Sequence, residues 1–261
     1  SGKTEIGVTA LPGRSITAEV WLVFALSLGA SGVRAVLNLI DDLTKKVPLS
    51  GQTTVLAGPA AQKPWLDLAV QLTSIAISMA PVLLVAYFLR LAGESLRSIG
   101  LDRDHLVADG LRGSALAAVV GGTGLALYLA AHAANSSLTV VPETFPPSWW
   151  RIPVLLLIAA QNAALEEILV VGYLLRQLKK LGWGDNRALA VSALLRGSYH
   201  LYQGFGAFLG NVAMGLLFGR IYQRFGRTAP LVVAHTLIDS VAFVGYIVLA
   251  GHASWLPVPG R

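Results

Sequence analysis

Long apolar runs, separated by short polar segments, dominate the chain after its first 14 residues. Several runs reach about 20 residues, which as a helix is long enough to cross the hydrocarbon core of a bilayer. The segments 1–14 and 41–64 are polar and contain Gly and Pro, so we expect them to lie outside the membrane. The pattern predicts seven transmembrane spans, over residues 17–40, 65–91, 113–135, 152–178, 187–203, 205–223 and 228–250.

The predicted fold is an all-α, polytopic membrane protein with a polar N-terminal tail over 1–14 and a single transmembrane domain over 15–261. Composition agrees, because 54% of the 261 residues are hydrophobic and only 13% are charged, about half the charged share of a soluble domain. These values exclude a soluble enzyme, a disordered chain and a fibrous repeat. The chain has no Cys, which excludes disulfides, thiolate catalysis and Cys-type zinc sites.

The basic residues indicate orientation rather than nucleic-acid binding. The formal net charge is +6, but no basic cluster is interleaved with aromatic residues, so we expect no nucleic-acid partner. With the N-terminus inside, 13 of the 20 Lys and Arg residues lie on the inner side and 5 on the outer side. This excess predicts a cytoplasmic N-terminus. The abundance of Ala, Gly, Val and Arg indicates a GC-rich bacterium, and therefore its plasma membrane.

Six ionisable residues fall well inside three predicted spans, where a charge costs about 3 kcal/mol or more. They are Glu166 and Glu167 in the fourth span, Arg196 and His200 in the fifth, and His235 and Asp239 in the seventh. Arg196/His200 and His235/Asp239 are i, i+4 pairs, so each pair shares one helix face. Counted from the cytoplasmic ends, Glu166, His200 and Asp239 lie roughly 18, 20 and 17 Å deep. We therefore expect one site near the middle of the membrane.

These residues resemble the motifs of the CAAX-type prenyl endopeptidases and their bacterial relatives, the Abi or bacteriocin-processing (CPBP) group of intramembrane proteases. That family has EExxxR on one helix, FxxxH on a second, and HxxxN or HxxxD on a third. Glu166-Glu167, followed by Gly172-Tyr173-Leu174, is similar to the first motif. Arg196 to His200 occupies the second motif, and His235 to Asp239 the third. The resemblance covers about residues 152–245 and implies a conical cavity among the fourth, fifth and seventh helices.

The resemblance implies a protease that cleaves a peptide bond near the membrane with a glutamate-activated water. Glu166 would be the general base, His200 would help to hold the water, and His235 would donate to the oxyanion. Glu167 would orient a neighbour or neutralise an Arg. Ionised Asp239 only accepts hydrogen bonds, so it would be protonated or would fix the His235 ring. The implied partners are membrane lipids and a membrane-embedded or membrane-anchored peptide or protein substrate, or a membrane protein complex.

Two departures from the family pattern leave an alternative open. The motif Arg is Val171 here, and the motif Phe is Arg196. Either the chain is a catalytically inactive membrane scaffold or partner-binding protein, or Arg196 replaces the missing Arg. In the second case we expect Arg196 to reach across from its own helix to Glu167, because its charge cannot lie unpaired at that depth.

A metal is the second catalytic alternative. Glu166, His200, His235 and Asp239 are residue types that a divalent metal such as zinc accepts. However, the chain has no HExxH-like pair, and Arg196 nearby would repel a cation. We therefore favour a mechanism without a cofactor.

Overall fold

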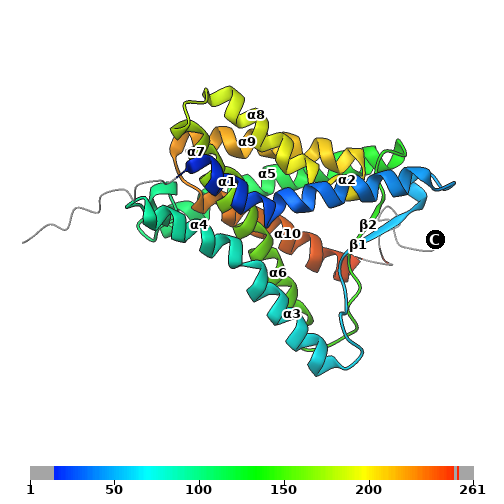
Figure 1. Ribbon diagram of the computed structural model, residues 1–261. Coiled ribbons are helices and arrows are strands. Elements are labelled where there is room, and N and C mark those ends of the chain that lie inside the picture. The colour runs from blue at the N-terminus through cyan, green and yellow to red at the C-terminus, as the bar shows by residue number, and fades with distance from the viewer. Residues whose placement is uncertain (1–14, 250–251, 253–261) are drawn as a thin grey trace, which may run out of the picture.

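The computed structural model describes residues 15–249 and His252, so the predicted tail over 1–14 lies outside the described residues. Helices make up most of the described chain (Figure 1). The α-helices are α1 (Ile16–Ala25), α2 (Leu28–Thr44), α3 (Pro64–Ser78), α4 (Ala80–Leu91), α5 (Leu106–Ala133), α6 (Arg151–Glu166), α7 (Leu174–Lys180), α8 (Asp185–Ser198), α9 (Phe205–Phe225) and α10 (Ala229–Leu249). Shorter helical turns are η1 (Leu49–Gly51), η2 (Leu96–Ile99), η3 (Glu167–Tyr173) and η4 (Leu201–Gln203). The prediction of an all-α membrane protein is confirmed.

The described residues contain five helical stretches that are long and apolar enough to span a membrane. These stretches are Pro64–Leu91, Leu106–Ala133, Arg151–Lys180, Phe205–Phe225 and Ala229–Leu249. Helices α1 and α2 meet at a bend of 47° and provide a sixth if they are counted as one span. The structure therefore has five or six candidate spans where the hydropathy pattern predicts seven.

The difference lies in the predicted span 187–203. Its helix, α8, has 14 residues and is therefore about 21 Å long, shorter than a hydrocarbon core of about 30 Å. After Ser198 the chain leaves the helix and reaches Gly204, whose φ of 99° favours glycine. His200 therefore lies beyond the end of α8, and not on the same helix as Arg196 as the i, i+4 spacing predicts.

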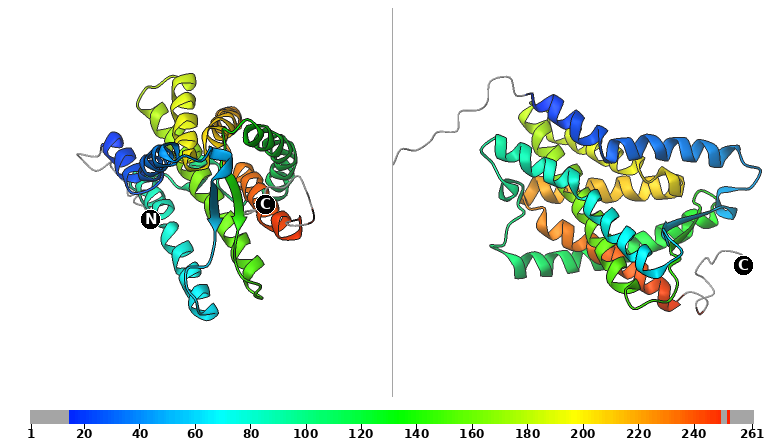
Figure 2. Two further views of the ribbon diagram at one scale, coloured as in Figure 1. Left: turned by 90° about the vertical axis from the view of Figure 1, so that its right-hand side faces the viewer. Right: turned by 60° about the horizontal axis from the view of Figure 1, so that its bottom comes forward.

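Helix packing brings the predicted site helices together. Helix α10 packs against α5 and α6, and α8 and α9 lie side by side (Figures 1 and 2). The turn η3, between α6 and α7, contacts α4, α8, α9 and α10. A Cβ atom at Gly215 of α9 would lie 3.2 Å from Arg196 Cδ, so glycine at this position lets α9 approach α8 closely.

Two short parallel strands cross one end of the helical bundle (Figure 2). They are β1 (Thr53–Ala57), in the connection between α2 and α3, and β2 (Thr139–Glu143), in the connection between α5 and α6. The backbone next to β2 also pairs with Gly204 through Ser137. This contact joins the chain just after His200 to the strand end of the bundle.

An ion-pair network closes the opposite end. Arg227, between α9 and α10, donates hydrogen bonds to Asp109 on α5 and to Asp102 in the preceding loop. The hydrogen bonds from Arg227 lower the pKa of Asp102 to about 2. The network fixes the start of α10, the helix that carries His235, against α5.

Candidate active site

The six predicted site residues come together where α6, η3, α8 and α10 meet. In each of these residues, a side-chain nitrogen or carboxylate oxygen lies within 3.8 Å of an oppositely charged or polar group of another of the six. Glu166 ends α6 and Glu167 begins η3, Arg196 lies on α8 with His200 just beyond it, and α10 carries His235 and Asp239. The expectation of a single cluster agrees with this arrangement.

Arg196 lies at the centre of the cluster, and its side chain is fully buried. Its Nη1 donates a hydrogen bond to Glu167 Oε1 at 2.7 Å, and its Nη2 lies 3.3 Å from Glu166 Oε2. The guanidinium also lies over the ring of Phe218, 5.5 Å from the ring centroid. Arg196 therefore makes the contact with Glu167 that the sequence predicts, and it holds both carboxylates of the pair.

Glu167 also orients His235. The Nδ1 of His235 lies 2.8 Å from Glu167 Oε1 and 3.2 Å from Arg196 Nη2. Ionised Glu167 only accepts hydrogen bonds and Arg196 only donates them, so the shorter of the two contacts, to Glu167, favours a proton on Nδ1. On the other edge of the ring, Nε2 lies 3.6 Å from Asp239 Oδ1, too far for a direct hydrogen bond. Glu167, and not Asp239, is therefore the direct partner that fixes the His235 ring.

His200 faces Glu166 from the end of α8. Its Nδ1 lies 3.0 Å from the backbone oxygen of Arg196. A carbonyl oxygen can only accept, so Nδ1 carries a proton and, in the neutral ring, Nε2 is an acceptor. Nε2 lies 3.8 Å from Glu166 Oε1. The two acceptor atoms, His200 Nε2 and Glu166 Oε1, are therefore close enough for one small molecule to donate hydrogen bonds to both.

Tyr199 is a site residue that the sequence analysis missed. Its hydroxyl donates a hydrogen bond to Glu166 Oε2 at 3.0 Å, and its ring lies 4.8 Å from the ring of His200 between centroids. Neighbours on a helix point about 100° apart, so a continuous helix would not aim Tyr199 and His200 at one carboxylate. The helix ends at Ser198, and no sequence signal that we identified marks that end.

The two glutamates are placed by an unusual stretch of backbone. From Glu167 to Tyr173 the chain forms a π-helix, whose turn is wider than that of an α-helix. Such turns are rare and occur frequently at functional sites. Both glutamates point toward the guanidinium of Arg196 from the junction of α6 with this wider turn.

Comparison with known families agrees with this cluster. Residues 147–241 match the family model Rce1-like, described as type II CAAX prenyl endopeptidase Rce1-like. The match covers just over a third of the chain and supports membership of the CAAX endopeptidase family. The matched residues include all six predicted site residues, and the family predicted from the sequence motifs is confirmed. No curated protein and no solved structure gives a significant match to the chain.

Val171, the position at which the resemblance implies an Arg, has no polar contact in the site. Its side chain is fully buried among apolar neighbours of η3 and the surrounding helices. The guanidinium that pairs with Glu167 comes from α8 instead. A positive charge against Glu167 is therefore present, and it comes from α8 rather than from the helix that carries Glu167.

The described residues also contain one group whose side chains could hold a metal. It consists of Glu166, Glu167 and His235, whose ligand atoms lie within 4.8 Å of one another. This set differs from the predicted alternative, which combines Glu166 with His200, His235 and Asp239. Arg196 contacts all three members of the group, so a cation there would have to displace or adjoin a buried guanidinium. The chemistry of the donor set therefore fits a metal poorly.

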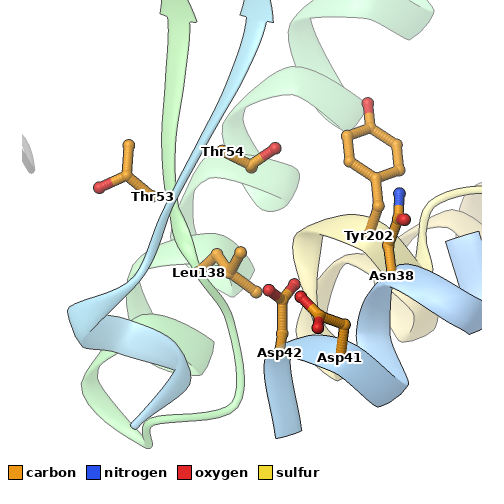
Figure 3. A pocket seen from close by; sticks show the side chains of 7 residues that line it. All are labelled: Asn38, Asp41, Asp42, Thr53, Thr54, Leu138 and Tyr202. Atoms are coloured by element: carbon orange, nitrogen blue, oxygen red, sulfur yellow. The ribbon is translucent and has the colours of Figure 1, made fainter. Parts of the chain in front are cut away.

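A hollow of about 190 Å³ lies at the strand end of the bundle (Figure 3). Side chains from α2, β1, η4 and the segment before β2 line it, namely Asn38, Asp41, Asp42, Thr53, Thr54, Leu138 and Tyr202. None of the six predicted site residues lines this hollow. Tyr202, two residues after His200, is the lining residue nearest to them in the sequence.

Proposed function

We propose that this protein is an intramembrane endopeptidase in which Glu166 activates a water molecule. The observation that carries the proposal is the arrangement around the Glu166 carboxylate. Its Oε2 is held by Tyr199 and Arg196, while its Oε1 faces the acceptor nitrogen of His200 at 3.8 Å. One oxygen of the base is thus anchored, and the other is directed toward a second acceptor.

A water between Glu166 Oε1 and His200 Nε2 can lie about 2.8 Å from each atom and donate one hydrogen bond to each. Its lone pair is then left to attack a peptide carbonyl. The tautomer of His200 is essential for this role, because a proton on Nε2 would repel the water hydrogen. The backbone oxygen of Arg196 sets that tautomer through its 3.0 Å contact with Nδ1.

In the proposed reaction the water oxygen bonds to the carbonyl carbon while Glu166 takes the water proton. The carbonyl oxygen becomes an oxyanion, which requires a nearby donor. His235 is the candidate, because Glu167 accepts from its Nδ1 and a protonated ring would present its Nε2 hydrogen to the substrate. The C–N bond then breaks, and Glu166 returns the proton to the leaving amine.

This assignment gives Glu167 and Arg196 positioning roles. Glu167 accepts from both Arg196 and His235 through one oxygen. Arg196 in turn contacts the base, Glu166. The presence of a guanidinium against both glutamates favours an active protease over the scaffold alternative, since the charge of the family motif is retained. The poor fit of a cation beside Arg196 favours a mechanism without a metal.

The substrate that we propose is a membrane-embedded or membrane-anchored peptide or protein, because the base lies within a membrane-spanning stretch. We also propose a bacterial plasma-membrane location with a cytoplasmic N-terminus, supported by the 13-to-5 distribution of basic residues. The cytoplasmic and the outer side of the membrane can be assigned by accessibility labelling of single introduced cysteines, because the chain has no cysteine of its own.

The proposed function is tested by peptide mapping of membranes from cells that make the wild-type protein or Glu166→Gln. The wild-type sample should contain new peptide termini that the variant sample lacks. Asp104→Asn, the same carboxyl-to-amide change at a half-exposed position outside the site, is the matched control and should give the wild-type pattern. Identical termini in all three samples would favour the scaffold alternative.

A further inference from the structure

The π-helical turn η3 is supported from outside by two hydroxyl groups. Ser192 on α8 donates a hydrogen bond to the backbone oxygen of Val170 at 2.8 Å. Tyr222 on α9 donates to the backbone oxygen of Gly172 at 3.2 Å. Both hydrogen bonds are buried. Within a membrane, irregular helical backbone is tolerated where neighbouring side chains satisfy its polar groups, and these two residues provide that support.

The two halves of this membrane-spanning stretch are fixed independently on either side of η3. On the α7 side, Glu94 accepts hydrogen bonds from Arg176 at 3.0 Å and from Lys180 at 2.7 Å. On the α6 side, Arg196 holds Glu166 and Glu167. The wider turn between them therefore sets the rotation of the glutamate pair relative to a fixed α7.

Ser192 and Arg196 make a two-point attachment to this turn. They are four residues apart on α8 and thus lie on the same helix face. Ser192 binds the backbone of η3, and Arg196 binds the side chain of its first residue, Glu167. A shift of η3 that breaks the hydrogen bond from Ser192 would therefore also move Glu167, the partner of Arg196.

We propose that Ser192 is a positioning residue, which holds the π-helical register of η3 so that Glu166 and Glu167 both reach Arg196. This role rests on the proposed function, because it acts through the catalytic base. Ser192 is almost fully buried and is not a member of the EExxxR, FxxxH or HxxxD motifs. A residue that only filled space here would need no hydroxyl group.

The first test is kinetic and uses purified protein with a fluorogenic peptide containing the cleavage site mapped in membranes. Ser192→Ala should lower kcat at least about 10-fold and leave KM within about twofold, since a misplaced base slows chemistry more than binding. Ser192→Cys, whose thiol is a weaker hydrogen-bond donor than the hydroxyl, should have a kcat between those of the wild type and Ser192→Ala. Thr123→Ala is the matched control, because the Thr123 hydroxyl donates to the backbone oxygens of Val119 and Val120 within α5, and it should retain the wild-type kcat.

The second test does not depend on activity. Thermal midpoints in detergent are measured for Ser192→Ala, Glu167→Gln and the double variant. If Ser192 positions Glu167, the shift of the double variant should differ from the sum of the single shifts by about 2 °C or more. The same cycle with Thr123→Ala should be additive.

Wild-type kcat in Ser192→Ala, or an additive thermal cycle, would overturn the assignment of Ser192. If Ser192→Ala does not fold, Ser192→Cys takes its place in both tests with the same criteria. If the wild-type protein cleaves nothing, the proposed function fails, and the thermal cycle still decides whether Ser192 is coupled to Glu167.

Discussion

Replacing Arg196 by Leu is expected to destabilise the protein strongly. The substitution removes the guanidinium and leaves two carboxylates without it, Glu167 with a fully buried side chain and Glu166 with a side chain only 10% exposed. Removing one partner of a buried ion pair typically costs about 3–5 kcal/mol, because the remaining charge stays buried. For a protein of this size each kcal/mol corresponds to about 2–4 °C, so the expected loss in thermal midpoint is roughly 6–20 °C.

The buried-charge explanation is separated from a packing effect by a second variant. Adding Glu167→Gln to Arg196→Leu removes one unpaired charge and should recover part of the lost stability. The control is Arg97→Leu at the ion pair with Asp104, where the side chains are 66% and 50% exposed. Removing an exposed pair should cost about 1 kcal/mol or less.

The assay is equilibrium unfolding in mixed detergent micelles, supported by thermal melting of the same samples. A free energy of unfolding for Arg196→Leu within about 1 kcal/mol of the wild-type value would refute the assigned role of the guanidinium. Failure of Glu167→Gln to recover any stability would show that lost packing, and not unpaired charge, dominates.

Three further predictions concern the base, the metal alternative and the end of the bundle away from the strands. Tyr199→Phe should lower kcat about 10-fold or more with little change in KM, because a hydrogen bond to a charged carboxylate contributes about 1.5–3 kcal/mol; steady-state kinetics checks this. Activity should survive thorough chelation followed by dialysis, and its loss and return with zinc would instead support the metal mechanism. Partial burial raises the pKa of Glu94, but the hydrogen bonds from Arg176 and Lys180 outweigh it and lower that pKa from 4.5 to about 2. A carboxyl group whose pKa is lowered by folding stabilises the folded state at every pH above its ordinary pKa. The free energy of unfolding of the wild type should therefore exceed that of Glu94→Gln by about 1 kcal/mol or less at neutral pH. That difference should disappear as pH falls from 4.5 toward 2 in unfolding titrations.

The composition of the site could be predicted from the sequence because the membrane makes each charge conspicuous. Glu166, Glu167 and Arg196 stand out in apolar runs, and each requires a partner at that depth. The same reasoning predicts the contact between Arg196 and Glu167, which the structure contains at 2.7 Å. Helical periodicity and residue depth were sufficient for this part of the site.

The local geometry could not be predicted because it depends on departures from the regular α-helix. The apolar run extends the predicted fifth span to residue 203, whereas α8 ends at Ser198. That end brings Tyr199 and His200 to the same carboxylate. The π-helical turn η3 is stabilised by hydroxyl groups from α8 and α9, and the sequence of η3 alone does not identify them.

The segment 41–64 is predicted from the sequence only as a polar loop outside the membrane. The segment 41–64 contains β1, which pairs with β2 from a connection about 86 residues further along the chain. The two segments lack the alternating pattern over a long run that marks strands in a single sequence. Their pairing is specified by tertiary contacts, including the backbone contact of Ser137 with Gly204.

The central claim is that Glu166 acts as the base in peptide-bond cleavage. It is tested most directly by the turnover rate of purified Glu166→Gln on the mapped peptide, with thermal melting to verify the fold. Gln retains the size of Glu and loses only its basicity, so we predict a fall in kcat of at least about 100-fold in a protein that melts as a folded species. A folded Glu166→Gln protein that cleaves the peptide at the wild-type rate would contradict the claim.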